Sequence, residues 1–380
     1  MTRDRFLHLQ GVRFLCATWV LCGRFLPDAH AGFWLFGKRR LNVAADIFAV
    51  LSGFVSGLQA PGYDEASADA SAEEWSRLGR RMLRILPALW LSMLWSLLFV
   101  RPWPPLKALQ CALLAEIWGE EAIRCPVGAA WFLTALVPCW TIFPLVSSGF
   151  RRSGSFALCA AVLWLAITCL GQILPNRHFL PLAALPDFCL GAAAARYVEA
   201  PEETLGEKVE ARPDSTGLML EGERVVAAGR VPWSLLADAS AAIIVSLVTF
   251  VPASFRNAWD EAELFREASG FDHFLAPLIA SFLLCSSQGG GKGAVQTVLR
   301  HQSMASLGHY SLYVYLFQEP LFRSIEAFVP DLEDSAEGFV FFVLCLWLIS
   351  GLYAEKVEPM LLKISVSSAS SDSEPTESTS

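Results

Sequence analysis

The sequence is poor in charged residues. Asp, Glu, Lys and Arg make up 17% of its 380 residues, whereas they make up roughly a quarter of a typical soluble domain. Hydrophobic residues make up 54%. Too few polar side chains remain to cover a soluble globule, so the composition excludes an ordinary soluble enzyme. The 13 Trp and 26 Phe residues fit a membrane instead, because aromatic rings favour the lipid headgroup region.

Several catalytic and metal-binding motifs are also absent. The sequence has no Gly-x-Ser-x-Gly, no His-Glu-x-x-His and no His-x4-Asp. Its ten cysteines show no Cys-x-x-Cys spacing, and several, including Cys111, lie in apolar runs. We interpret them as small residues of membrane helices, and not as a disulfide framework or a zinc site. Residues 286–293 resemble a phosphate-binding loop but lack its first glycine and its final hydroxyl residue, which favours a flexible turn.

Apolar stretches of about 20 residues, the length that crosses a bilayer core, recur along the chain. Ten qualify: 6–27, 41–59, 82–100, 129–147, 155–174, 179–198, 233–252, 271–287, 304–323 and 337–355. A shorter stretch, 105–118, follows Pro102 and Pro104 and is predicted to be interfacial or re-entrant. The sequence therefore predicts an all-α polytopic membrane helix bundle of about ten transmembrane helices.

The loops predict the orientation and the domain boundaries. Lys and Arg are more numerous in the loops on the side of the N-terminus, although the run 38–40 counts against this bias. The positive-inside rule then places both termini in the cytosol. Residues 1–366 form the predicted membrane domain, interrupted by an acidic cytosolic linker at 199–231, and the Ser/Glu-rich tail 367–380 is predicted to be disordered.

Charged residues inside the predicted spans are the first candidate site. A charge in hydrocarbon costs roughly 2.5 to 3.5 kcal/mol, so each must face protein, water or a headgroup. Arg13 and Arg24 lie on similar faces of the first span, and Asp46 lies in the second. Arg24 is the expected partner of Asp46, because both lie in the outer halves of their helices. The pair fits a polar pocket, a structural ion pair, or an Arg24 side chain that reaches the outer interface.

Arg81 and Arg84 are the second candidate site. They are three residues apart at the start of the third span and therefore share a helix face. Guanidinium groups bind phosphate oxygens in a bidentate manner, so the pair is suited to grip phosphates. The spacing alone favours the simpler interpretation, a positive-inside anchor or a contact with anionic lipid.

Five segments, in order along the chain, resemble the acyltransferase-3 family. These are VRFLCATWVLCGRFLP from residue 12, ADIFAVLSGF from residue 45, RRMLRILPALW from residue 80, AWFLTALVPCWTIFPL from residue 130 and LGHYSLYVYLFQEPLF from residue 307. Members of this family are membrane enzymes that move acyl groups from a cytosolic donor such as acyl-CoA onto sugars, lipids or other acceptors. The resemblance extends along nearly the whole membrane portion of the chain.

The resemblance implies roles for individual residues. It implies that Arg81 and Arg84 handle the acyl donor and that Asp46 and Ser52 lie in the reaction chamber. The expected ligands are acyl-CoA as co-substrate and a small hydroxyl-bearing acceptor, within the lipid bilayer of a membrane that the sequence does not identify. No permanently bound cofactor, no metal and no nucleic acid is expected.

The chain departs from the family where the family places its histidines. Family members carry a His eleven residues after the opening Arg of the first helix, where this chain has Arg24, and a second His where it has Gln318. Neither arginine nor glutamine accepts a proton near neutral pH as imidazole does. The nearby imidazoles are those of His30 and His309.

Two functions remain open from the sequence. The first is an O-acyltransferase with its reaction centre in a cavity, open to the cytosol beside Arg81, on which four residues converge: Arg24, Asp46, Ser52 and Gln318. The second is a catalytically lapsed family member that acts as a transporter or interaction protein.

Overall fold

The computed structural model is all-helical in the part of the chain that it describes, which confirms the all-α part of the predicted fold class. The described residues are 6–27, 40–60, 68–100, 103–115, 125–128, 130–151, 156–171, 181–198, 232–250, 273–288, 293–329 and 335–363. The longer helices are α1 (Leu7–Phe25), α4 (Leu41–Gln59), α5 (Ala68–Phe99), α7 (Ala130–Arg151), α8 (Phe156–Gly171), α9 (Pro181–Ala195), α11 (Trp233–Phe250), α13 (Ala276–Gln288), α15 (Gln302–Glu326) and α16 (Ala336–Leu352). Two short helices, α6 (Pro105–Ala112) and α14 (Ala294–Leu299), a 3₁₀ turn, His273–Leu275, and a π-helical turn, Tyr353–Val357, complete the described set.

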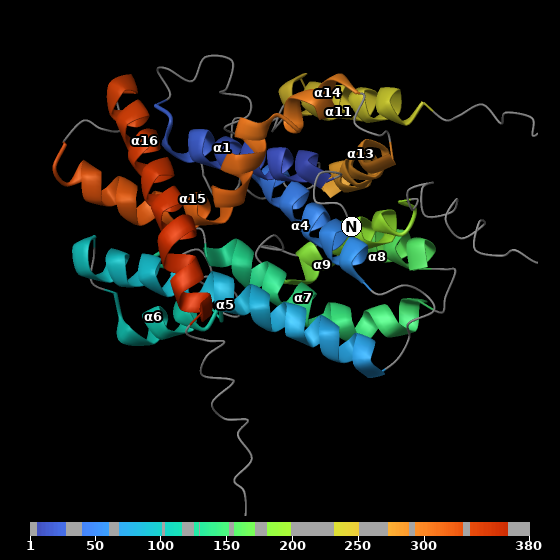
Figure 1. Cartoon of the computed structure of the whole chain (residues 1–380), viewed down its shortest axis with the longest axis horizontal. Helices are drawn as coiled ribbons and strands as arrows, with labels where there is room; N and C mark the ends of the chain where they lie inside the picture. The colour runs from blue at the N-terminus through green and yellow to red at the C-terminus, as the bar shows by residue number, and fades with distance from the viewer. Residues whose placement is uncertain are drawn as a thin grey trace, which may run out of the picture.

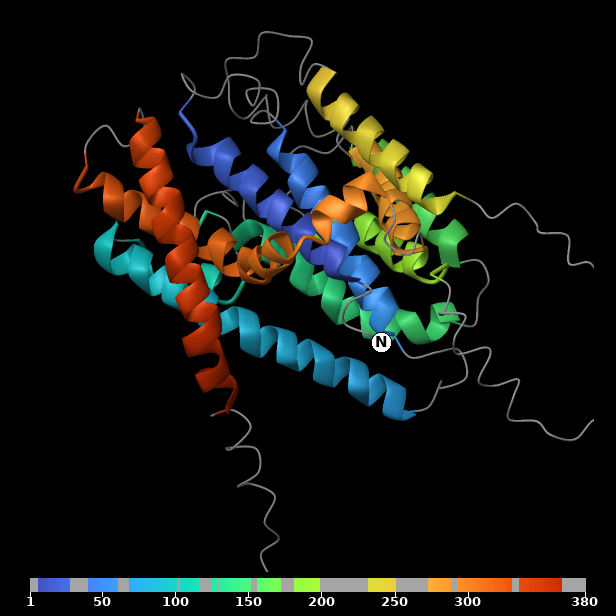
Figure 2. The ribbon, with the colours of Figure 1, turned by 45° about the horizontal axis from the view of Figure 1, so that its top comes forward.

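These helices form one bundle. Helices α1 and α4 lie in its middle, with α5 and α7 on one side and α11, α13 and α14 on the other (Figure 1). Helix α16 crosses the bundle against α15, and its C-terminal end approaches α5 (Figure 2). The strongest packing joins α4 to α9 and α1 to α15, helices far apart in the sequence.

Within the described residues, each of the ten stretches predicted to span the membrane contains a helix. Four helical segments are long and apolar enough to cross a bilayer by themselves: Leu41–Gln59, Ala72–Phe99, Trp233–Phe250 and Ala336–Lys363. Shorter apolar helices accompany them. Helix α6 has 8 residues, about 12 Å, and is too short to span, as expected for an interfacial element. The linker 199–231, the tail 367–380 and His30 lie outside the described residues.

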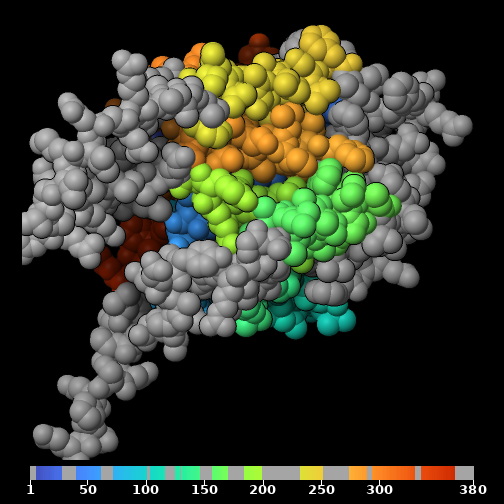
Figure 3. Space-filling model, turned by 90° about the vertical axis from the view of Figure 1, so that its right-hand side faces the viewer, coloured from blue at the N-terminus to red at the C-terminus, as the bar shows by residue number. Residues whose placement is uncertain are grey.

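Large apolar side chains cover the outside of the bundle. On α8 they include Leu158 and Val162, and on α11 they include Leu235 and Val245, each more than half exposed. Both helices lie on the surface in Figure 3, where α11 is yellow and α8 is green. Such extensive apolar exposure marks a membrane-facing surface, so the outer faces of α8 and α11 fit contact with lipid.

Glycines let the central helices approach closely. A Cβ on Gly53 of α4 would overlap the Phe188 carbonyl of α9, and one on Gly308 of α15 would overlap the Gln10 carbonyl of α1. Small residues at such crossings are typical of membrane helix packing, because they allow backbones to touch. These two glycines therefore set the positions of α4 and α15, both of which line the cavity described below.

Substitution of Gly308 by alanine is expected to lower stability by about 1 to 3 kcal/mol, because the added methyl group forces α15 away from α1. Gly79→Ala is the matched control. A Cβ at Gly79 would meet no atom within 4 Å, and alanine is the better helix former. Thermal unfolding of the purified protein in detergent measures both variants. Equal melting temperatures for the two variants would contradict this account of the crossing.

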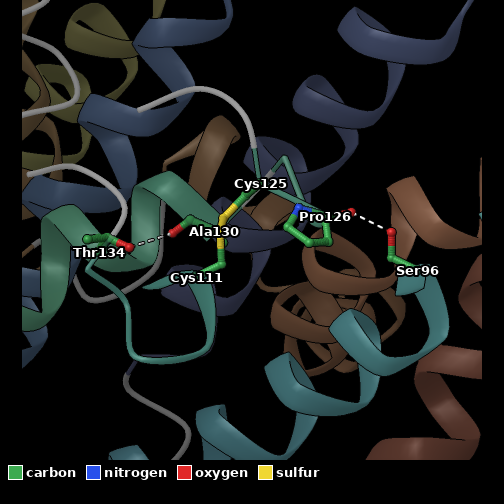
Figure 4. The surroundings of a disulfide bond; sticks show 6 residues. All are labelled: Ser96, Cys111, Cys125, Pro126, Ala130 and Thr134. Atoms are coloured by element: carbon green, nitrogen blue, oxygen red, sulfur yellow. Dashed lines mark hydrogen bonds between the residues drawn. A yellow bond between two sulfur atoms is a disulfide. The ribbon is translucent and has the colours of Figure 1, made fainter. Parts of the chain in front are cut away.

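A disulfide corrects one sequence-based prediction. Cys111 on α6 is bonded to Cys125, which precedes α7, with 6.1 Å between their Cα atoms (Figure 4). The interpretation of the cysteines as membrane-helix residues is wrong for this pair, because α6 is a short helix whose end meets the start of α7. The turn is also tied to α5, since the Ser96 hydroxyl donates to the Pro126 carbonyl at 2.7 Å. Cys16, Cys139 and Cys285 are buried in helices and are not disulfide-bonded, as predicted.

Candidate functional site

A cavity of about 210 Å³ lies between α1, α4, α5, α7 and α15. Its apolar wall comes mainly from α4 and α7. Polar side chains from the other helices complete it, and the polar and cationic residues that line it are Gln10, Arg13, Ser52, Arg81, Arg84, Trp140, His309, Ser311 and Tyr315. The cavity thus combines an apolar wall with three guanidinium groups.

Arg81 is held at the cavity by neutral groups. Its Nη1 donates to the Ser56 hydroxyl at 3.0 Å, and its guanidinium lies 5.5 Å from the centroid of the Trp140 ring. Trp140 in turn donates from Nε1 to the Ser52 hydroxyl at 2.6 Å. Among the described residues, no carboxylate lies within ion-pair distance of Arg81. Its positive charge is therefore oriented but not neutralised.

Arg13 is a second cation of this kind. Its Nη1 donates to the Gln10 side chain at 3.4 Å, a weak contact, and no carboxylate in the described part of the chain pairs with it. It lies within electrostatic range of Arg81 and Arg84, which repel it. Burying like charges together is unfavourable unless an anion joins them, so the arrangement is suited to an anionic ligand.

Arg84 differs, because a carboxylate compensates its charge. Its Nε lies 2.6 Å from Glu358 Oε1, and it also donates to the Tyr313 hydroxyl at 3.3 Å. Its Nη2 lies 3.5 Å from His309 Nε2. Because arginine only donates, His309 must accept through Nε2 in this contact. The predicted Arg81 and Arg84 pair thus contains one uncompensated and one compensated cation.

The structure brings together three of the predicted site residues: Ser52, Arg81 and Arg84 line the cavity. Asp46 is buried at 8% exposure, and Gln318 is fully buried, but neither lines it. The Gln318 amide has no hydrogen-bond partner for its nitrogen or its oxygen within the described residues. Of the four residues expected to converge on one cavity, Ser52 does so.

The predicted pairing of Arg24 with Asp46 is wrong. Arg24 Nη2 lies 3.3 Å from Glu319 Oε2, on α15, which packs along α1. Gly128, in the turn next to the disulfide, leaves room for this pair. A Cβ there would lie 2.6 Å from Glu319 Oε2 and 3.1 Å from Arg24 Nη2.

The Arg24–Glu319 pair lies close to the cavity. Tyr315 lines the cavity and is within electrostatic range of both charges. It precedes Glu319 by four residues, one helical turn, on the same face of α15. Tyr315 therefore connects the cavity lining to the ion pair.

The sequence contains a signal for Glu319, to which sequence analysis assigned no role. Glu319 is a carboxylate inside the predicted span 304–323, and the rule that singled out Arg24 applies equally to it. Glu358 carries a weak signal, since Glu358 and Pro359 loosely resemble the closing Glu-x-Pro of the family, whereas Trp140 has no signal of its own because its contacts come from other helices. No group of three or more His, Cys, Asp or Glu residues in the described ranges is arranged to hold a metal ion.

Comparison with known proteins gives one match. The acyltransferase-3 family model, described as an acyltransferase domain, matches residues 6–354. No curated protein and no solved structure matches the chain. The matched range runs from the start of α1 into the π-helical turn after α16 and includes every helix that lines the cavity. On this evidence the chain belongs to the acyltransferase-3 family, a family of membrane acyltransferases.

Proposed function

We propose that this chain is a membrane-embedded O-acyltransferase that transfers an acyl group from a cytosolic acyl-CoA-type donor to a hydroxyl of a sugar, lipid or other acceptor. The observation that carries the proposal is the cavity, where Arg13 and Arg81 hold positive charge without a carboxylate partner in the described residues. Coenzyme A carries phosphates, and arginine is the side chain best suited to bind them.

The rest of the cavity suits the other end of such a donor. Phe48, Leu51, Phe132 and Leu133 form an apolar wall for an acyl chain. At about 210 Å³ the cavity is smaller than the sites that enclose a drug-sized ligand, which are roughly 300 to 1,000 Å³. In this proposal the cavity binds the thioester arm and one phosphate, and the remainder of the donor lies at the cavity opening. Binding of coenzyme A by the purified protein tests this assignment, and absence of binding would overturn it.

The proposed topology has about ten crossings with both termini in the cytosol. In that arrangement α5 ends on the non-cytosolic side, and the Cys111–Cys125 disulfide follows it there. Disulfides persist in oxidising compartments and are rare in the cytosol. The arginine-rich beginning of α5 lies at the opposite end, which supports entry of the donor from the cytosol.

The disulfide itself gives a direct prediction. Protein from cell membranes, denatured and alkylated with a large maleimide, is expected to gain two reactive thiols after reduction. Cys111→Ser leaves no bond to reduce, so it is expected to show the same number of thiols before and after. Cys285→Ser, which removes a free buried thiol, is the control and keeps the difference of two. No difference in the wild-type protein would contradict the oxidised state and the orientation based on it.

Transfer requires that the acceptor hydroxyl attack the thioester carbonyl. A carbon–oxygen bond forms, the carbon–sulfur bond breaks, coenzyme A leaves as its thiolate, and the hydroxyl proton must go to a base. Arg24 cannot accept this proton. We assign that role to the Glu319 carboxylate, which lies 3.3 Å from Arg24 and one helical turn from the cavity-lining Tyr315, and we propose that Ser52 contacts the reacting groups from the cavity wall.

A second candidate function is a catalytically lapsed family member that binds the donor without transferring its acyl group. Two observations favour it. The Arg24–Glu319 pair lies outside the cavity, and Gln318 stands where relatives are expected to carry an imidazole. Turnover of acetyl-CoA separates the two functions.

A further inference from the structure

A π-helical turn near the end of the described chain aims two carboxylates at neighbouring tyrosines. The Glu358 backbone N–H donates to the Tyr353 carbonyl five residues earlier, as in a π-helix. The Tyr310 hydroxyl donates to Glu355 Oε1 at 2.5 Å, and the Tyr313 hydroxyl donates to Glu358 Oε2 at 2.5 Å. Single π turns occur frequently at functional sites. One residue corresponds to about 100° of helical rotation, so the wider turn changes which face Glu358 occupies.

The two carboxylates differ in what else they touch. Glu355 is exposed, and its hydrogen bond to Tyr310 is outside the cavity lining. The Glu358 side chain is 11% exposed, and its second oxygen lies 2.6 Å from Arg84 Nε. Arg84 lines the cavity beside Arg13 and Arg81. Glu358 therefore neutralises one of the three cations there, although it comes from a helix that does not line the cavity.

We propose that Glu358 is a specificity-determining residue that limits the cavity to two uncompensated guanidinium groups and thereby sets the charge of the anion that it accepts. The proposal rests on the proposed function of the cavity as a donor site. Glu358 engages Arg84 at Nε, and Tyr313 holds the carboxylate from its other oxygen. The guanidinium group of Arg84 is thus fixed in orientation, while Arg13 and Arg81 supply the net positive charge that binds the phosphate of the ligand.

Removal of this negative charge without a change of shape tests the proposal. Glu358→Gln keeps one oxygen that can accept from Arg84, and its amide nitrogen can donate to the Tyr313 hydroxyl in place of the bond that this hydroxyl now donates, but it leaves three uncompensated cations. We expect roughly tenfold tighter binding of coenzyme A and of inorganic pyrophosphate, with a steeper loss of affinity as salt rises. Calorimetry on the full-length protein in detergent, at low and at moderate ionic strength, measures both ligands.

Two further variants complete the test. Glu355→Gln makes the same chemical change in the same π-helical turn but away from Arg84, so its affinities should match those of the wild type. Glu358→Asp keeps the charge, and it should stay within about threefold of the wild type even where the shorter side chain lowers the melting temperature.

The possible outcomes separate this inference from the function on which it rests. Equal or weaker binding of both anions by Glu358→Gln, or an equal gain in Glu355→Gln, overturns the role of Glu358. Failure of coenzyme A to bind, with pyrophosphate binding that still tightens in Glu358→Gln, overturns the donor site and supports the role of Glu358. Failure of both anions to bind any form of the protein overturns both.

Discussion

Replacement of Arg81 by alanine is expected to weaken coenzyme A binding by more than a hundredfold. Arg81 is one of two cavity cations without a carboxylate partner in the described residues. Truncation of one member of a buried charge pair costs about 2 to 5 kcal/mol, because the other charge is left without its partner. The phosphate of the proposed donor would lose this interaction at the arginine-rich beginning of α5.

Arg80→Ala is the matched control for this experiment. Arg80 is the adjacent residue on α5, is exposed, and donates to the Ser76 hydroxyl at 2.8 Å. It does not line the cavity. Its removal subtracts the same charge from the same helix turn, so it is expected to change the affinity by less than threefold, since exposed charges are largely screened.

A thermal-shift titration with coenzyme A, checked by calorimetry, measures both variants. The melting temperatures of the wild-type protein and of Arg80→Ala should rise with ligand concentration. The melting temperature of Arg81→Ala should not rise at the same concentrations. The affinity of Arg81→Lys for coenzyme A should lie between those of the wild type and Arg81→Ala. An ammonium group keeps the positive charge but loses the bidentate geometry of the guanidinium and its stacking on Trp140. Equal losses in Arg80→Ala and Arg81→Ala would mean that α5 contributes only a general positive field.

The helices of this protein were predictable because their signal is local. An apolar run of about 20 residues predicts a membrane helix by itself, and each predicted span contains a helix in the part of the chain that the structure describes. The disulfide was not predictable in this way, since Cys111 and Cys125 become neighbours only when α6 is too short to cross and its end meets α7.

The candidate site was predictable to the extent that single helices define it. Arg81 and Arg84 share a face of α5, and Ser52 lies in a segment that resembles a family signature, so all three could be named. The partners that other helices contribute could not be predicted from the sequence. Arg24 pairs with Glu319 and not with Asp46 because α15 packs along α1, a tertiary fact that spacing along the chain does not contain.

Glu358 shows a further limit of sequence-based prediction. An ideal helix continued from α16 would place this residue on another face, and only the π-helical turn directs it to Arg84. Arg81 and Arg84 look equivalent in the sequence. The structure distinguishes them, because the Glu358 carboxylate pairs with Arg84 and not with Arg81.

Glu319→Gln is expected to abolish acyl transfer while leaving donor binding intact. A positioned general base contributes about 10² to 10⁴ in rate, and an amide cannot take the hydroxyl proton. The side chain keeps its size beside Gly128 and loses only its charge toward Arg24. We therefore expect kcat to fall at least a hundredfold and the Kd for coenzyme A to change by less than twofold, the reverse of the pattern for Arg81→Ala.

The assay follows the release of the coenzyme A thiol from acetyl-CoA, with glycerol and glucose as hydroxyl acceptors, by the purified full-length protein. Glu326→Gln is the control. Glu326 lies on the same helix in a comparable ion pair, 2.8 Å from Arg323, and it is not part of the cavity. It should release thiol at the wild-type rate. Full turnover by Glu319→Gln would show that another group takes the proton and would remove Glu319 from the mechanism.

Arg24→His decides between an active and a lapsed enzyme. If the wild type binds coenzyme A but releases no thiol with any acceptor, the chain is a lapsed member, and an imidazole at position 24 is expected to restore turnover because it supplies a titratable base next to the Glu319 carboxylate. If the wild type is active, the same substitution removes the guanidinium group that pairs with Glu319, and turnover should fall. The sign of this one change therefore tells whether the Arg24–Glu319 pair is the working proton acceptor of this enzyme or the structural replacement of one that it has lost.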